Sequence, residues 1–148
     1  MTPQLAASIR AQKATSRAGL KEDEMSEHPN ATVVREMNEA MFSGDMAGAA
    51  SRLADDVVWH FIGRADPYHG KAELAASMGG LSAFNITWEG HDLLASDDHV
   101  IALGTATAKH GDRSLIYRTA EIYHVRNGKV SERWAFSDDT KAITDFFG

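Results

Sequence analysis

The stretch YRTAEIYHVRNGKVSERWAFSDD, residues 117–139, decides the fold. Two apolar-rich runs are joined by Asn127-Gly128, which is a strong β-hairpin signal because both residues of a type I′ turn need a positive φ. A two-residue turn places Val125 opposite Val130 and thereby sets the pairing of every residue further along the two strands. We therefore predict two long antiparallel strands, one on each side of this turn.

This register also predicts which side chains share a face of the sheet, because successive side chains of a strand point to opposite faces. The members of one face are Thr119, Glu121, Tyr123, Val125, Val130, Glu132, Trp134 and Phe136. The members of the other face include Arg118, Ala120, Ile122, His124, Arg133 and Ala135. An apolar face that carries two carboxylates is typical of the floor of a ligand pocket.

Length and composition limit the class of protein. The 148 residues suffice for one domain, and 43% hydrophobic with 24% charged residues is ordinary for a soluble globular protein. A net charge of −6 without a basic stripe argues against a nucleic acid or an anionic membrane surface as partner, and no apolar run is long enough to cross a membrane. The absence of cysteine excludes disulfides and thiolate chemistry and is compatible with the cytoplasm, where we expect the protein.

The chain divides into two parts of different composition. Residues 1–28 begin with a run of small and basic residues that contains neither an aromatic nor an acidic side chain, so we expect a flexible N-terminal extension. The sequence leaves open what this extension does and whether Met25 is the true start. Residues 29–148 carry the periodic apolar patterns of a folded domain.

These patterns predict the remaining elements. Helical spacing predicts a helix that Asn30 caps and Gly44 ends, a second short helix that Asp45 caps and that reaches Leu53, and a terminal helix capped by Asp139. A third helix is expected over 71–81, after a loop over 64–70, and strands are expected over 57–63, 84–94, 99–109, 114–126 and 129–137. The order α-α-β-α-β-β-β-β-α is typical of an α+β domain in which helices cover one face of an antiparallel sheet.

Several short segments, in this order, resemble the nuclear transport factor 2-like superfamily and, within it, the SnoaL-like polyketide cyclase group. The segments that carry the resemblance are Phe42-Ser43-Gly44-Asp45, Leu53 to His60, Gly63, Tyr68-His69-Gly70-Lys71, Leu93 to His99, Tyr123 to Glu132, Trp134, Phe136 and Asp138-Asp139. The resemblance implies a curved sheet wrapped by helices into a cone, with a deep apolar pocket for a small hydrophobic molecule. It also implies a homodimer, for which the face with Ala120, Ile122, Arg133 and Ala135 is the expected interface.

The resemblance implies several cofactor-independent chemistries, because the superfamily contains polyketide cyclases, ketosteroid isomerase, scytalone dehydratase, epoxide hydrolases and members without a known activity. Glu121 matches the position of the oxyanion-hole acid of ketosteroid isomerase. Met37 and Phe61, however, stand where that enzyme has its catalytic tyrosine and aspartate. Steroid isomerase activity is therefore not expected.

Two glutamates on the predicted pocket face are the first candidates for proton transfer. Glu121 and Glu132 are diagonal neighbours in the predicted register, and two carboxylates in an apolar cup cannot both ionise cheaply. We expect one of them to act as a general acid. The alternative is that Glu132 lies in water at the rim and that Glu121 pairs with Arg118 or Arg133.

Two further candidates have a structural alternative. His60 could shuttle a proton or orient a ligand carbonyl, or it could be a structurally hydrogen-bonded histidine. Asp138 could serve as an acid or base at the pocket mouth, or it could help Asp139 cap the terminal helix.

Aromatic side chains are the candidates for the pocket lining, with a purely structural core as the alternative. These residues are Trp59, Phe61, Tyr68, Trp88, Tyr123, Trp134 and Phe136. No spacing such as HExxH, GxGxxG or a P-loop is present, so neither a metal nor a cofactor is expected. We predict a cyclase, isomerase, dehydratase or epoxide hydrolase that acts on a small carbonyl or polyketide-like compound. The alternative is a non-catalytic module of the same fold that binds small molecules or dimerises.

Overall fold

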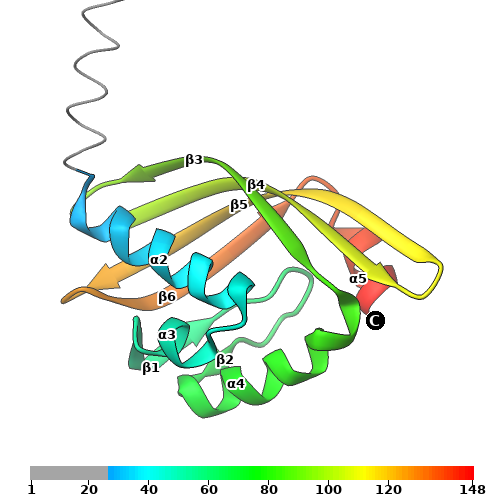
Figure 1. Ribbon diagram of the computed structural model, residues 1–148, viewed down its shortest axis with the longest axis horizontal. Helices are drawn as coiled ribbons and strands as arrows, with labels where there is room; N and C mark the ends of the chain where they lie inside the picture. Colours follow the sequence, from blue (N-terminus) through cyan, green and yellow to red (C-terminus); the bar gives the residue numbers. More distant parts are fainter. Residues whose placement is uncertain (1–26) are drawn as a thin grey trace, which may run out of the picture.

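The structure, a computed structural model, describes residues 27–148 (Figure 1). The elements are α2 (Pro29–Ser43), α3 (Met46–Ala50), β1 (Leu53–Trp59), β2 (Tyr68–His69), α4 (Gly70–Leu81), the 3-10 helix η1 (Ser82–Phe84), β3 (Thr87–Ala95), β4 (His99–His110), β5 (Arg113–Arg126), β6 (Lys129–Ser137) and α5 (Thr140–Phe147). The predicted α+β class is confirmed. The expectations for residues 1–28 and for Met25 lie almost entirely outside the described residues.

The six strands form one sheet in the order β2-β1-β6-β5-β4-β3. Helices α2, α3 and α4 lie on one side of this curved sheet, and α5 lies near one end of it (Figure 1). Strand β1 runs parallel to β6, whereas all other neighbours are antiparallel. The prediction of a wholly antiparallel sheet is therefore wrong at this one pair. The chain returns to β1 only after the β3–β6 meander, and β6 then runs in the same direction as β1.

The ends of the first two helices show which of the predicted helix caps are present in the structure. The left-handed φ of 86° at Gly44 ends α2 as predicted, and Asp45 caps α3 by accepting from the Gly48 backbone N–H at 2.9 Å. Asn30, in contrast, lies inside α2, because His28 occupies the cap position and its Nδ1 accepts from the Asn30 N–H. The Asn30 amide instead donates to carbonyls of the β3–β4 turn at 2.9 and 3.1 Å, which ties the helix to the sheet.

The first strand begins earlier than predicted. β1 starts at Leu53 and ends at Trp59, so the expected strand over 57–63 is wrong in its second half and the second helix ends at Ala50. β1 accommodates Asp55 and Asp56, because both are exposed and their carboxylates form ion pairs with Lys71 of α4 and Arg126 of β5. The short strand β2, which pairs with the end of β1, lies within the expected loop.

The hairpin turn is confirmed, but the register beyond it differs from the prediction. Asn127 and Gly128 have φ values of 53° and 74°, and Val125 pairs with Val130. The next pair joins His124 to Glu132, so β6 contains one extra residue, Ser131. An extra residue of this kind is a β-bulge, and it reverses the inward and outward alternation of the bulged strand relative to its partner.

This bulge corrects the predicted faces of β6. Tyr123 pairs with Arg133 and Glu121 pairs with Ala135, so Arg133 and Ala135 share the helix-covered face with Glu121. Glu132, Trp134 and Phe136 pair with His124, Ile122 and Ala120 and lie on the opposite, uncovered face. The prediction that these three side chains belong to the pocket face is wrong, and so is the prediction that Arg133 and Ala135 belong to the exposed face.

Candidate functional site

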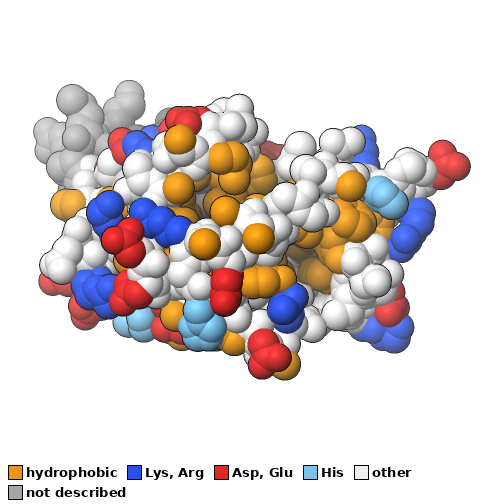
Figure 2. Space-filling model, turned by 90° about the horizontal axis from the view of Figure 1, so that it is seen from below, with side chains coloured by type: hydrophobic (Ala, Val, Ile, Leu, Met, Phe, Trp, Pro, Cys, Tyr) orange, Lys and Arg blue, Asp and Glu red, His pale blue; other side chains and the backbone are white. Residues whose placement is uncertain are grey.

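A cavity of about 930 Å³ lies between the helix-covered face of the sheet and helices α2, α4 and α5. We call this cavity the cup. Most of its lining is apolar, for example Met41, Phe61, Leu81, Trp88 and Ile143. Figure 2, the view from below Figure 1, shows hydrophobic side chains gathered at a hollow on this side of the molecule. The volume lies in the range of small-molecule sites.

The polar side chains that line the cup include five from β5, β6 and α2, namely Asn38, Thr119, Glu121, Tyr123 and Arg133. All five are at most 9% exposed. Arg133 donates from Nη2 to Glu121 Oε1, and the Tyr123 hydroxyl donates to Glu121 Oε2 at 3.4 Å. Since a buried charge is tolerated only when it is paired, each member of the Glu121–Arg133 pair needs the other.

The surroundings of this pair shift the pKa values of its neighbours. Burial, followed by the charge of Glu121, raises the pKa of the Tyr123 phenol. Burial alone would lower the pKa of the Arg133 guanidinium, but the charges and hydrogen bonds of Glu121 and Tyr123 outweigh it and raise that pKa. Tyr123 therefore keeps its proton, and Arg133 keeps its charge, at neutral pH. Toward a ligand, the Arg133 guanidinium can act only as a donor, whereas the neutral Tyr123 hydroxyl can donate or accept.

Aromatic rings from the end of β1 frame the guanidinium. The Arg133 Cζ atom lies 4.8 Å from the centroid of a Trp59 ring and 6.0 Å from that of Phe61. Trp59, the last residue of β1, and Phe61 just beyond the strand line the cup, whereas the His60 side chain between them contacts Glu132 on the outer face. Cation–π contacts of this kind favour a fixed guanidinium position.

Trp88 forms a wall of the cup, and a glycine allows it to do so. The indole Nε1 donates to Thr119 Oγ1 at 3.0 Å, and Phe42 stacks on the ring with centroids 6.3 Å apart. A Cβ atom at Gly104 would lie only 2.3 Å from the indole, so the ring packs directly on the β4 backbone. Glycine permits such a close approach.

Tyr68, another predicted lining residue, lies at the cup and contacts two side chains of the loop that precedes it, Phe61 and Arg64. Its ring meets Phe61 edge-on with centroids 5.4 Å apart, and its hydroxyl accepts a hydrogen bond from Arg64. Of the seven predicted lining residues, those that line the cup are Trp59, Phe61, Tyr68, Trp88 and Tyr123.

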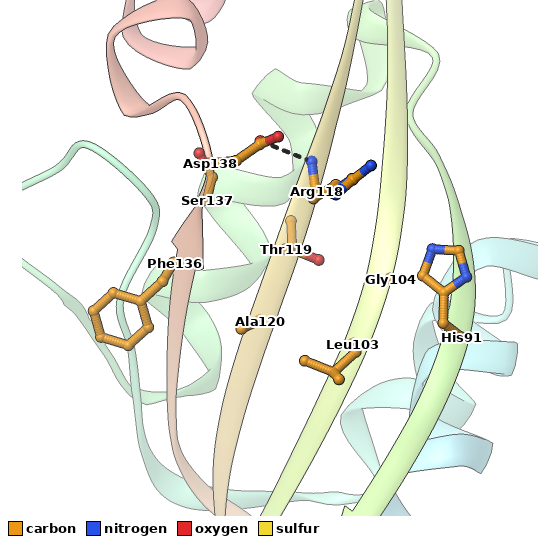
Figure 3. A pocket seen from close by; sticks show the side chains of 9 residues that line it. All are labelled: His91, Leu103, Gly104, Arg118, Thr119, Ala120, Phe136, Ser137 and Asp138. Carbon is orange, nitrogen blue, oxygen red and sulfur yellow. Dashed lines mark hydrogen bonds between the residues drawn. The ribbon is translucent and has the colours of Figure 1, made fainter.

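The remaining predicted site residues lie outside the cup. Glu132 and His60 hydrogen-bond each other on the outer face of the sheet at 2.9 Å, and Trp134 stacks on His60. Phe136 and Asp138 line a shallow hollow of about 370 Å³ on that same face, shown in Figure 3. Asp138 Oδ1 accepts there from the Arg118 backbone N–H at 3.0 Å, while Asp139 caps α5 as predicted.

Arg133 is the functional residue that the hairpin register misplaced. The sequence named it only as a possible partner of Glu121 on the exposed face, and the Ser131 bulge moves it to the inner face. A usable signal was the rule that a buried carboxylate needs a counter-charge. Applied to Glu121, that rule favours a register that turns Arg133 inward.

Within residues 27–148, no three His, Asp or Glu side chains gather closely enough to hold a metal ion. Likewise, none of the helices in this part of the chain has the length and apolar character needed to cross a membrane.

Comparisons with known proteins agree with this fold. A solved structure of Bal32a, from a soil-derived mobile gene cassette, is 26% identical with a TM-score of 0.76 and covers 81% of this chain and 97% of its own. A nuclear transport factor 2-like protein of unknown function from Burkholderia pseudomallei is 23% identical with a TM-score of 0.72, covering 80% of this chain and 97% of its own. IdmH, a candidate polyketide cyclase from Streptomyces antibioticus, is 20% identical with a TM-score of 0.65, covering 80% and 99%.

The comparison with curated proteins gives no match. The SnoaL-like domain, in contrast, matches residues 34–133, which is more than half of the chain and contains Glu121, Tyr123 and Arg133. The match begins in α2 and ends in β6, so it contains the lining of the cup except for the residues of α5 and Gly148. The chain therefore belongs to the SnoaL-like domain family.

Proposed function

We propose that the protein is a cofactor-independent acid/base enzyme that acts on a small hydrophobic carbonyl or polyketide-like compound bound in the cup. The observation that carries this proposal is the buried group of Glu121, Arg133 and Tyr123 in an otherwise largely apolar cavity. Pockets of this composition suit ligands that are mostly apolar and carry a few oxygen atoms.

The geometry favours Glu121 as a base, because its partner Arg133 balances the carboxylate charge. Glu121 would take a proton from the carbon next to a ligand carbonyl, and the electron pair of that C–H bond would move to the carbonyl oxygen. The Arg133 guanidinium, and the Tyr123 O–H once Glu121 is protonated and no longer its acceptor, would stabilise the resulting oxyanion by donating to it. An enolate formed in this way can be reprotonated at another carbon, which is isomerisation, or can attack a second carbonyl, which closes a ring.

Replacing Glu121 by glutamine tests the base. We expect wild-type protein to catalyse deuterium exchange next to the carbonyl of 2-tetralone in D₂O, followed by NMR, and Glu121→Gln to lower this rate by roughly 10²–10⁴-fold. Glu39→Gln is a matched control, because Glu39 is exposed on α2 outside the cup, and its rate should stay at the wild-type level. Equal rates for wild type and Glu121→Gln would refute the role of the base.

The alternative function is a non-catalytic binding module with the same cup. It would be favoured if the anthraquinone alizarin, a planar coloured probe with carbonyl and phenolic oxygens, binds to the protein while no exchange of 2-tetralone occurs. The stacked Phe42–Trp88 wall supports flat ligands under either function. We also retain the expectation of a cytoplasmic protein.

A homodimer is part of the proposal, with an interface that the bulge redefines. Four large apolar side chains on the uncovered sheet face are exposed, namely Leu94 (51%), Leu103 (37%), Ile116 (70%) and Phe136 (57%). Phe136 and Leu103 flank the shallow outer hollow, so the same face offers both a protruding ring and a depression (Figure 3). A two-fold interface needs such self-complementarity.

Phe136→Glu is expected to weaken this dimer by at least about 30-fold in its dissociation constant, because the charge would be buried where an aromatic anchor packs. Sedimentation velocity across a concentration series measures the change. Lys129→Glu, an exposed change at the hairpin turn, is the control and should leave the constant unaltered. A dimer that survives Phe136→Glu would place the interface elsewhere.

A further inference from the structure

His60 and Glu132 are two of the predicted site residues that lie outside the cup, and they form a cluster with Trp134 on the outer face. His60 Nε2 lies 2.9 Å from Glu132 Oε2, with the two side chains 28% and 29% exposed. The Trp134 ring stacks on the imidazole at an interplanar angle of 11° and a centroid distance of 5.5 Å. The imidazole is therefore held along its edge and across its face.

The backbone of His60 holds Arg133 from the other direction. The His60 N–H donates to the Arg133 carbonyl at 2.9 Å, and Arg133 Nη1 donates to the His60 carbonyl at 2.9 Å. The same guanidinium donates from Nη2 to Glu121. A single residue thus contacts both the backbone and the charged head of the arginine in the cup.

The position of His60 at the end of a strand makes its two hydrogen bonds with Arg133 important for the orientation of the guanidinium. Strand β1 ends at Trp59, and the next strand begins only at Tyr68, so the bond from the His60 N–H lies where regular pairing stops. Strand ends open more easily than strand centres. If residue 60 moved, the buried guanidinium would lose one of its two acceptors, which costs free energy.

The sequence alternation around Arg133 links the two sides of the sheet. Glu132 and Trp134 point outward to His60, and Arg133 between them points inward to Glu121. The geometry points to His60 as a positioning residue for the ion pair of the cup, with Glu132 and Trp134 as its anchors on the outer face. Anchoring the imidazole fixes the carbonyl that orients Arg133, and the oriented guanidinium fixes Glu121. This role rests on the proposed function only in assuming that the cup binds a ligand.

The test uses four variants of the full chain with two measurements. His60→Ala removes the imidazole, Glu132→Leu removes its anchor, and Glu132→Gln keeps an oxygen that can accept from His60. His124→Ala is the matched control, because His124 also packs on Trp134, with centroids 4.7 Å apart, while its side chain makes no contact with the His60 carbonyl. The measurements are alizarin affinity and the NMR cross-peak of Arg133 Nε–Hε, a buried donor without a partner among residues 27–148.

Loss of the imidazole or its anchor is expected to weaken alizarin binding by roughly 2- to 30-fold and to shift or broaden the Arg133 cross-peak. Glu132→Gln and His124→Ala should stay within about 2-fold of wild type. If His60→Ala does not fold, Glu132→Leu decides, because it leaves residue 60 intact. Lower thermal stability with unchanged affinity and an unchanged cross-peak would reduce the cluster to a structural role and overturn the inference.

The outcome is separable from that of the proposed function. Wild-type protein that does not bind alizarin counts against the proposed ligand class, and the cross-peak alone then decides the positioning role. A shifted cross-peak in both His60→Ala and Glu132→Leu supports it, and an unchanged one refutes it.

Discussion

Replacing Arg133 by methionine is expected to destabilise the fold by roughly 3–5 kcal/mol, because it leaves the carboxylate of Glu121 buried without its counter-charge. Methionine approximates the length of the arginine stem, so the loss should reflect charge more than packing. Urea unfolding at a fixed protein concentration, followed by tryptophan fluorescence, measures the change.

Two further variants separate charge from volume in this experiment. Arg126→Met removes an arginine whose partner, Asp56, is 73% exposed, and it should cost less than about 1 kcal/mol. The double variant Arg133→Met/Glu121→Leu removes both buried charges and should regain most of the lost stability. A double variant as unstable as Arg133→Met alone would show that the unpaired charge is not the cause.

Adding one methyl group at Gly104 is expected to destabilise the protein by about 1–3 kcal/mol and to move the Trp88 wall of the cup. The new Cβ would lie 2.3 Å from the indole, so the ring must shift and would strain its hydrogen bond to Thr119. Thermal unfolding gives the stability, and alizarin affinity reports the altered wall.

A glycine elsewhere in the chain provides the control for this substitution. Gly79 lies in α4 and has open space at the Cβ position, so Gly79→Ala should stabilise the protein by roughly 0.5–1 kcal/mol through helix propensity. A smaller side chain at position 88 should relieve the clash, so Gly104→Ala is expected to cost less in a Trp88→Leu background than in wild type. An equal cost in both backgrounds would contradict contact with the indole as the cause.

Local signals predicted local structure well. The Asn127-Gly128 turn, the end of α2 at Gly44 and the caps of Asp45 and Asp139 all follow from backbone preferences of one to four adjacent residues. Errors appear where a competing partner lies far away in the sequence. Asn30 caps no helix because the β3–β4 turn offers its amide two carbonyls.

The bounds of the first strand were predicted wrongly for a similar reason. Aspartate is depleted in strands, yet Asp55 and Asp56 lie within β1, where Lys71 and Arg126 come within 3.3 and 2.8 Å of their carboxylates. Parallel pairing of β1 with β6 joins segments more than seventy residues apart. No pattern within either segment encodes that neighbour.

The sequence by itself determined the α+β class, the position of the hairpin turn, the family resemblance and the inward placement of Glu121 and Tyr123. These follow from composition, from turn chemistry and from the period of two along a single strand. Only the tertiary structure decided that Arg133 enters the cup while Glu132, Trp134 and Phe136 leave it. The physical reason is the bulge at Ser131, since one extra residue reverses the parity of β6, and its placement suits a buried carboxylate that needs a cation.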